Sequence, residues 1–262
     1  MRLKNDALQV FFQLIRKDLL AFWRDYPSKL LDTAICFATN VIVFAYFMPQ
    51  EGIREGYGLF FLIGVISSFG LIEVVGKVGA FVADIYGEKT ISSTLVMPIR
   101  SEGVFCYIAI FWALTSALLA IMLFPLGKFL LFHEFDLSSI SYTRLVVMFT
   151  SSNLFYGIFG LWVASLLNDI GSLNRLWLRY VVPIWMFGGY FYSWKSSMLL
   201  NPIIGCVSLI NPMIYIMEGM RAAVIGQEGY LPYWVCLIMV WVFNIVLLKH
   251  AVFRLKRKLD CV

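Results

Sequence analysis

The feature that most constrains this chain is a series of long apolar segments, each close to the length that crosses a lipid bilayer as an α-helix. A transmembrane helix needs about 20 predominantly apolar residues. Six segments approach or exceed that length: 28–48, 58–85, 103–125, 145–167, 176–192 and 234–253. Their number predicts an all-α, multi-pass integral membrane protein with six transmembrane helices in one domain, the bundle spanning 28–254.

The composition supports lipid rather than water as the main solvent. Hydrophobic residues make up 61% of the 262 residues and charged residues only 14%, against roughly 45–50% and about 25% in soluble domains. Too few polar groups remain to cover a soluble surface. A composition this rich in aromatic residues also excludes disordered chains and basic nucleic-acid-binding arrays, so no nucleic-acid partner is expected.

The first 24 residues have a different pattern. In segment 7–24, apolar residues such as Phe11, Ile15, Leu19 and Phe22 follow helical spacing on one face, and cations lie on the other. This pattern is typical of a helix in the membrane interface, with Pro27 ending it before the first span. A soluble helix that packs on a partner is the alternative.

Lysine and arginine are distributed unevenly between the two sides of this six-span topology. With the N-terminus in the cytoplasm, 15 of the 21 cations fall on the cytoplasmic side and five outside, and Lys77 lies within the membrane. Positive charge concentrates on the cytoplasmic side of membrane proteins. Both termini are therefore expected to be cytoplasmic.

Segment 193–233 is apolar, but Asn-Pro pairs and a glycine interrupt it. A seventh span here would move the five cations of the C-terminal region to the outside, so a re-entrant or interfacial segment on the outer side is expected before the sixth span. In its second half, Asn211 is a predicted helix N-cap, Pro212 the first helical residue and Gly226 the stop.

The catalytic motifs of common enzymes are missing. The sequence contains no GxxxxGK[ST] phosphate-binding loop, no HExxH and no GxSxG, and it has only two histidines. We therefore expect a non-enzymatic chain with no catalytic residues, no metal site and no cofactor of its own. The five cysteines do not suggest a disulfide framework.

Three charged residues fall in or near the second apolar segment. Glu73 and Lys77 are four residues apart on one helical face, and Asp84 lies seven residues further on. Charges at this depth must be paired or face water. A structural ion pair is one interpretation, and a cavity-facing or gating group is the other.

Two segments resemble the permease subunits of type-2 ABC exporters. The first, in 86–102, resembles the cytoplasmic coupling segment of that family in the spacing from Thr90 to Pro98. The second resembles the family's Asn-Pro-x-x-Tyr-x-x-Glu-x-x-Arg segment before the last span. The residues of the first are Glu88, Lys89, Thr90, Ile91, Leu95, Pro98 and Arg100. Those of the second are Asn211, Pro212, Tyr215, Glu218 and Arg221.

The resemblance implies a non-catalytic permease in a bacterial plasma membrane, with a cytoplasmic coupling helix between spans two and three. Such a subunit pairs with a second permease copy and with two copies of a separate ABC ATP-binding subunit, which carry ATP and Mg²⁺. The implied substrate is amphipathic: a lipid, a glycolipid or polysaccharide, or a drug-like molecule. The alternatives are an ion-coupled secondary transporter or channel that uses Glu73, Lys77 and Asp84, and a membrane-assembly factor.

Overall fold

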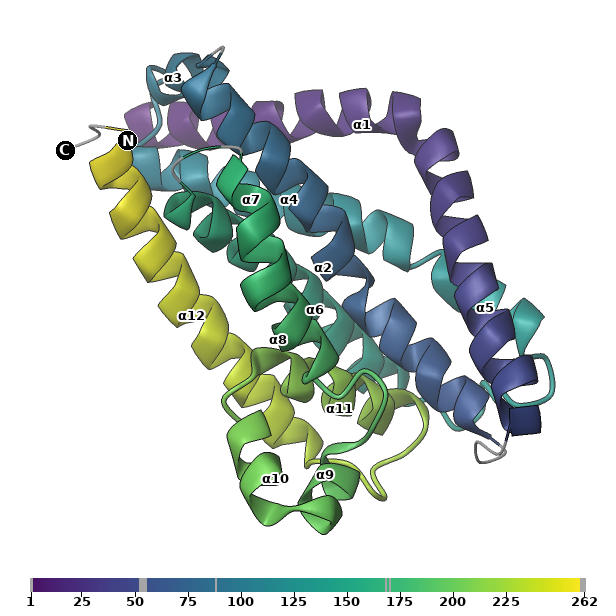
Figure 1. The fold of residues 1–262 in the computed structure, drawn as a ribbon. Coiled ribbons are helices and arrows are strands. Elements are labelled where there is room, and N and C mark those ends of the chain that lie inside the picture. Colours follow the sequence, from purple (N-terminus) through teal and green to yellow (C-terminus); the bar gives the residue numbers. More distant parts are fainter. Residues whose placement is uncertain (1, 52–55, 88, 168, 170, 260–262) are drawn as a thin grey trace.

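The computed structural model describes residues 2–51, 56–87, 89–167, 169 and 171–259, and the regular elements in these ranges are helical (Figure 1). Within these ranges, five helical segments are long and apolar enough to span a bilayer, or six if the bent pair Pro202–Ser208 and Pro212–Val224 counts as one span. They are Gln9–Gln50, Tyr57–Tyr86, Ser101–Leu130, Tyr142–Leu166 and Tyr233–Lys258. The fold is therefore that of an all-helical, membrane-embedded protein. Four of the expected spans, 58–85, 103–125, 145–167 and 234–253, lie within these segments to within one residue.

The first helix differs from its prediction. Helix α1 (Arg2–Ile42) runs through Pro27, and a π-helical turn (Val43–Phe47) and a 3₁₀ turn (Met48–Glu51) extend it. The expectation that Pro27 ends the helix was wrong. Figure 1 shows α1 changing direction sharply along its length, as proline inside a helix commonly causes. At 1.5 Å per residue the 42-residue helical segment Gln9–Gln50 has a contour length of about 63 Å, twice the hydrocarbon thickness, so only part of it can cross the bilayer.

Helices α2 (Tyr57–Tyr86) and α6 (Tyr142–Leu166) form the centre of the bundle. They pack against α4 (Ser101–Ala120), α5 (Leu123–Leu130) and α12 (Tyr233–Lys258). Glycines make the closest approaches: a Cβ on Gly157 would lie 2.1 Å from the Ala109 carbonyl oxygen, and one on Gly70 2.3 Å from the Tyr156 ring. Small residues allow helices to approach closely where lipid gives no hydrophobic driving force.

The segment expected as the fifth span, 176–192, is shorter than the others. Helix α7 (Gly171–Leu176), a π-helical turn (Trp177–Val181) and α8 (Val182–Met186) form one helical stretch. It begins and ends several residues before the prediction and carries Arg175 and Arg179. Its 16 residues measure about 24 Å, so it is short for a full crossing.

The segment before α12 folds into three short helices. They are α9 (Trp194–Leu200), α10 (Pro202–Ser208) and α11 (Pro212–Val224), with a bend of 94° between α10 and α11. Asn211 caps α11 and Pro212 is its first residue, as the sequence predicts. Gly226 comes after the helix with a φ of 130°, a conformation that favours glycine.

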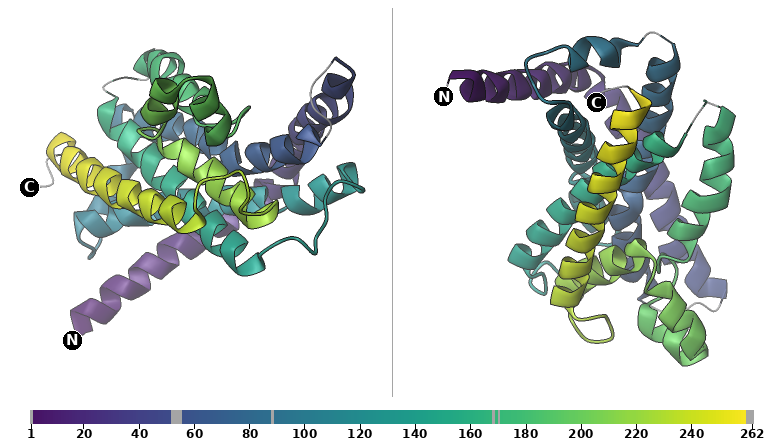
Figure 2. Two further views of the ribbon diagram at one scale, coloured as in Figure 1. Left: turned by 90° about the horizontal axis from the view of Figure 1, so that it is seen from below. Right: turned by 90° about the vertical axis from the view of Figure 1, so that its left-hand side faces the viewer.

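The two ends of the bundle carry different elements (Figures 1 and 2). One end holds α3 (Thr90–Leu95) and the basic end of α12, where Lys256 pairs with Glu102 at 2.7 Å. The other holds α9 and α10. We call these the basic end and the hairpin end.

If the basic end faces the cytoplasm, single cysteines at the two ends will react from opposite sides of the membrane. In a variant without the native cysteines, Ser196→Cys in α9 is expected to react with an impermeant maleimide on intact cells, because Ser196 is exposed at the hairpin end. Arg257→Cys is expected to react only after the cells are opened. Labelling of Arg257→Cys on intact cells would show that the basic end faces the outside instead.

Candidate functional site

The conspicuous polar cluster of the chain is built around α11, where the Asn-Pro-x-x-Tyr-x-x-Glu-x-x-Arg residues lie. Asn211 accepts a hydrogen bond from the Met213 amide at 3.0 Å and donates its side-chain amide to the Ile184 carbonyl at 2.6 Å. Tyr215 donates its hydroxyl to the Leu209 carbonyl at 2.8 Å. Asn211 therefore caps α11 and ties it to α8, and Tyr215 ties the helix to the end of α10.

Glu218 is fully buried on α11. One carboxylate oxygen accepts from the Trp194 amide at 3.1 Å and the other from the Leu231 amide at 3.0 Å. Those amides begin α9 and precede α12. A single carboxylate thus fixes two loops that are 37 residues apart in sequence.

Arg221 is also fully buried. Its guanidinium donates to the carbonyls of Gly189 at 2.6 Å, Tyr190 at 3.0 Å and Phe60 at 3.3 Å. It also lies 3.5 Å from the centroid of the Phe60 ring. Arg221 therefore joins α11 to α2 and to the turn after α8.

Gly64 on α2 makes room for this guanidinium. A Cβ at Gly64 would lie 2.9 Å from the Arg221 side chain and 3.2 Å from the Tyr190 carbonyl oxygen. Any larger residue would displace either the guanidinium or the turn that it holds.

Although Glu218 and Arg221 lie three residues apart on α11, they do not form a direct ion pair. Within the described chain, the ion pairs shorter than 4.0 Å are Glu73–Lys77 and Lys256–Glu102. Glu218 and Arg221 instead bind separate backbone groups, and their opposite charges compensate at longer range. Sequence spacing alone did not reveal these backbone partners, because they lie between 13 and 161 residues away.

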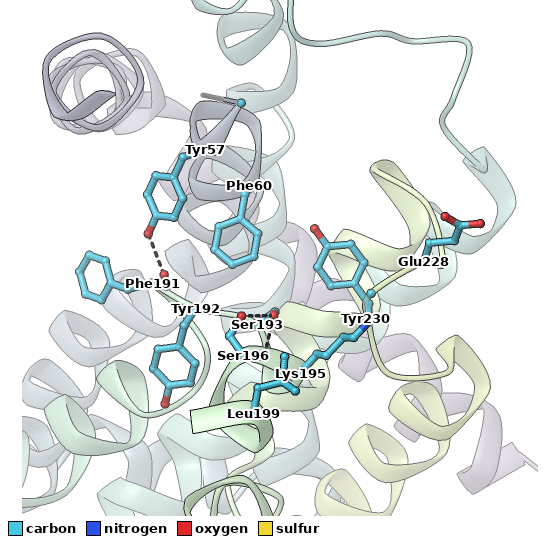
Figure 3. Close-up of a pocket in the computed structure, with 12 residues that line it drawn as sticks. Tyr57, Phe60, Phe191, Tyr192, Ser193, Lys195, Ser196, Leu199, Glu228 and Tyr230 are labelled. Carbon is cyan, nitrogen blue, oxygen red and sulfur yellow. Dashed lines mark hydrogen bonds between the residues drawn. The ribbon is translucent and has the colours of Figure 1, made fainter. Parts of the chain in front are cut away.

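A cavity of about 510 Å³ opens beside this cluster at the hairpin end. Its wall includes Tyr57, Phe60, Tyr192 and Tyr230, with Lys195 nearby (Figure 3). Tyr57 donates its hydroxyl to the Phe191 carbonyl at 2.8 Å. Burial raises the pKa of Tyr230, so its phenol stays neutral. The cavity is aromatic, with uncharged hydroxyl groups and two exposed charges of opposite sign, Lys195 and Glu228.

Loss of either buried charge is expected to lower stability far more than loss of a nearby exposed charge. Arg221→Met removes hydrogen bonds to four backbone carbonyls and leaves Glu218 uncompensated, and Glu218→Ala leaves two amides without their acceptor. Each should cost about 3–5 kcal/mol, seen as reduced monodisperse yield and thermal midpoint in detergent.

Lys195→Met, which removes an exposed cation from the same end of the molecule, serves as the control. Wild-type stability is expected for this control. Wild-type stability of Arg221→Met as well would refute the structural role of Arg221.

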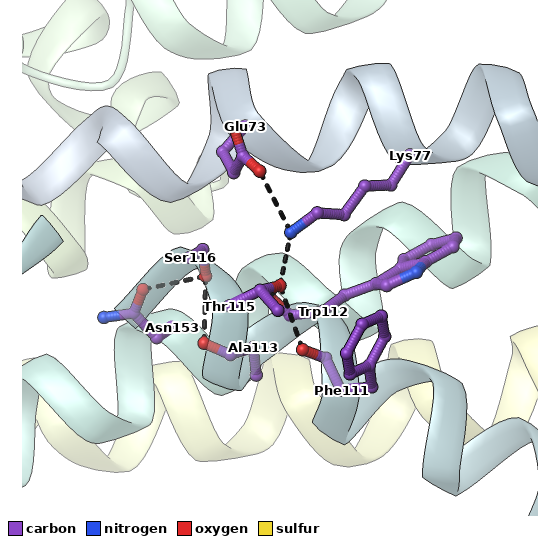
Figure 4. Close-up of polar contacts among 8 residues, drawn as sticks. All are labelled: Glu73, Lys77, Phe111, Trp112, Ala113, Thr115, Ser116 and Asn153. Carbon is purple, nitrogen blue, oxygen red and sulfur yellow. Dashed lines mark hydrogen bonds and ion pairs between the residues drawn. The ribbon is translucent and has the colours of Figure 1, made fainter. Parts of the chain in front are cut away.

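The charged pair on α2 is formed as the spacing predicts. The Lys77 ammonium lies 3.1 Å from the Glu73 carboxylate, and both side chains are mostly buried. Lys77 also donates to the Thr115 hydroxyl, which in turn donates to the Phe111 carbonyl at 3.0 Å (Figure 4). The pair therefore links α2 to α4.

Asp84 is not part of this pair. It lies in the last turn of α2, where its carboxylate accepts from the amides of Thr90 and Ile91, each at 2.9 Å, and from the Thr90 hydroxyl. Asp84 thus binds the otherwise unpaired amides at the start of α3. Lys89, the residue before α3, has a φ of 56°, so the turn is tight.

The Glu73–Lys77 interaction is testable by a double-mutant cycle. Either Glu73→Gln or Lys77→Met leaves a mostly buried charge without its partner, whereas the double variant removes both charges. We expect a coupling energy of about 1–2 kcal/mol in thermal or denaturant unfolding. Additive effects of the two substitutions would mean that the pair contributes nothing to stability.

The predicted coupling segment forms the short helix α3 and the turn after it. Ile91 is buried and Leu95 is half-buried against the bundle, whereas Lys89, Thr90, Pro98 and Arg100 are exposed. Val96 and Met97 are the exposed apolar residues, and Val96 is 86% exposed. Glu88 lies outside the described residues.

Comparison with known proteins does not assign a family: no protein-family model and no curated protein matches this chain. In the described part of the chain, no three histidine, cysteine or acidic side chains cluster as metal ligands would.

Proposed function

We propose that this chain is the membrane-spanning permease subunit of an ATP-driven ABC exporter. The observation that carries the proposal is α3, a short helix with an exposed apolar tip at the basic end. The Asp84 carboxylate fixes this helix to the end of α2. A rigid, exposed contact on a central membrane helix is what energy transfer from another protein requires.

The absence of a phosphate-binding loop from the sequence agrees with a division of labour between subunits. In the proposed complex, two copies of a separate ATP-binding subunit hold ATP and Mg²⁺, and two copies of this chain form the pathway. Movement of α3 would pass directly into α2, because three hydrogen bonds to Asp84 join them.

The second motif supports the same proposal in another way. Its polar residues bind backbone groups of α2, α8, α9 and the loop before α12, so they shape the hairpin end. This end would form the outer mouth of the exporter in the bacterial plasma membrane, with both termini and α3 in the cytoplasm. The apolar bundle suits an amphipathic substrate: a lipid, glycolipid, polysaccharide or drug-like molecule.

The ion-coupled alternative has less support. It requires Glu73, Lys77 and Asp84 to act together, but Asp84 binds the start of α3 and Glu73 pairs with Lys77. Neither arrangement leaves one of these two carboxylates free for a coupling ion or a proton.

In the proposed topology, the short α7–α8 stretch takes the place of the fifth of the six expected spans, although it is short for a full crossing.

Val96 tests the contact better than Leu95, because Leu95 also packs against the bundle. Val96→Asp places a charge on the exposed apolar tip, which costs at least a few kcal/mol if a partner groove covers it. We expect loss of export and of co-purification with the proposed ATP-binding subunit, with unchanged size-exclusion behaviour of the permease.

Ser93→Asp is the control, because Ser93 is exposed on the same helix but is not part of its apolar tip. It adds the same charge and should retain most of the ATP-binding subunit. Full co-purification and export with Val96→Asp would exclude this tip as the coupling contact.

A further inference from the structure

A second cavity, of about 460 Å³, lies between α1, α2, α3 and α4. Each helix contributes residues at helical spacing, so the cavity is an ordered part of the fold. Its volume falls in the range of small-molecule sites. The cavity takes no part in the proposed coupling contact, which faces outward from α3.

One wall of this cavity is apolar and aromatic. Trp112 is nearly fully buried, and Phe81 packs edge-on against it with ring centroids 5.7 Å apart. Phe22 of α1 and Phe111 of α4 continue the wall. Figure 4 shows Trp112 and Phe111 on the same stretch of α4 as Thr115, the partner of Lys77.

The charged groups of the cavity fall into two sets. Lys77 and Asp84 are held by partners within the protein, and Asp18 accepts a hydrogen bond from the Tyr107 hydroxyl. Lys29 and Asp25, one helical turn apart on α1, are different. Lys29 is half-buried and contacts the Phe22 ring at 5.2 Å, and neither residue has an ion-pair partner within 4.0 Å in the described chain.

The position of the cavity relates these charges to the bilayer. Asp25 and Lys29 flank Pro27, within the helix that changes direction in Figure 1. The segment before Pro27 carries exposed Phe12, Leu20 and Trp23, as an interfacial helix does. If this segment lies in the membrane interface, as its exposed apolar residues indicate, the cavity beside it lies at the depth of the lipid headgroups.

We propose that this cavity binds a phospholipid with a zwitterionic, primary-amine headgroup of the phosphoethanolamine type. Lys29 binds the phosphate, and Asp25, the other charge of the cavity without an ion-pair partner in the described chain, binds the ammonium. The glycerol and upper acyl chains lie along the aromatic wall. This inference depends on membrane embedding but not on ATP-driven export.

The test measures lipids retained by the purified full-length chain in detergent, using native mass spectrometry. The lipids are phosphatidylethanolamine, phosphatidylcholine and phosphatidylglycerol with the same acyl chains. We expect phosphatidylethanolamine to bind about tenfold more tightly than phosphatidylcholine, because methylation removes the N–H donors to Asp25. Asp25→Asn should abolish this preference.

Lys29→Gln should weaken retention of all three lipids about tenfold, because all three carry the phosphate. Lys17→Gln, an exposed cation on α1 outside the cavity, is the matched control and should bind as wild type. Thermal midpoints identify any variant that fails to fold. If Lys29→Gln fails to fold, the loss of headgroup selectivity in Asp25→Asn tests the proposal instead.

Equal retention of phosphatidylethanolamine and phosphatidylcholine by the wild type would overturn the proposal. So would equal behaviour of Lys29→Gln and Lys17→Gln. Displacement of the lipid by free phosphoethanolamine at the same concentration would show that the cavity binds the soluble headgroup, and it would refute the proposal of a lipid site. No ATP-binding subunit is present in this assay. A negative result for the lipid site therefore leaves the exporter proposal unaffected, and a negative result in the coupling experiment leaves the lipid proposal unaffected.

Discussion

The arrangement of the hairpin end depends on two charges that have no access to water. Arg221 and Glu218 are fully buried on α11, and a buried charge is tolerated only when hydrogen bonds and an opposite charge compensate it. The guanidinium finds its partners in carbonyls of α2 and of the turn after α8, and the carboxylate finds two amides of distant loops. Irregular backbone at membrane depth must have such partners, so these two side chains make the non-helical turns around α11 possible.

A second charge-dependent connection operates at the opposite end. Asp84 binds the first amides of α3, and Lys256 and Lys258 of α12 bind Glu102 and the carbonyl end of α6. The exposed elements at the basic end are thereby attached to the spanning helices. Under the proposed function, a force applied to α3 would reach α2, which Arg221 connects to α11. This gives a continuous route of contacts between the two ends, built from Asp84, α2 and Arg221.

The two cavities lie in different parts of the bundle and have different linings. The cavity at the hairpin end is lined by tyrosines, and the one between α1 and α3 combines an aromatic wall with Lys29 and Asp25, which have no ion-pair partner in the described chain. Lys29 is half-buried and Asp25 is exposed, so in a bilayer each needs water or a charged headgroup as its partner. Their position beside the bend of α1 therefore suggests contact with headgroups, where both charge types are available.

The sequence by itself determined the features that depend on local chemistry and on segment length. Apolar runs predicted the membrane environment and four of the spans, Asn211-Pro212 predicted the start of α11, and the spacing of Glu73 and Lys77 predicted their ion pair. The tertiary structure decided the rest. Pro27 lies inside α1 rather than ending it, and α1 packs against α2, α4 and α5. Asp84 caps α3 instead of joining the charged pair, and Glu218 and Arg221 bind backbone groups instead of each other. Their partners lie in other segments of the chain, so no local pattern carries that information.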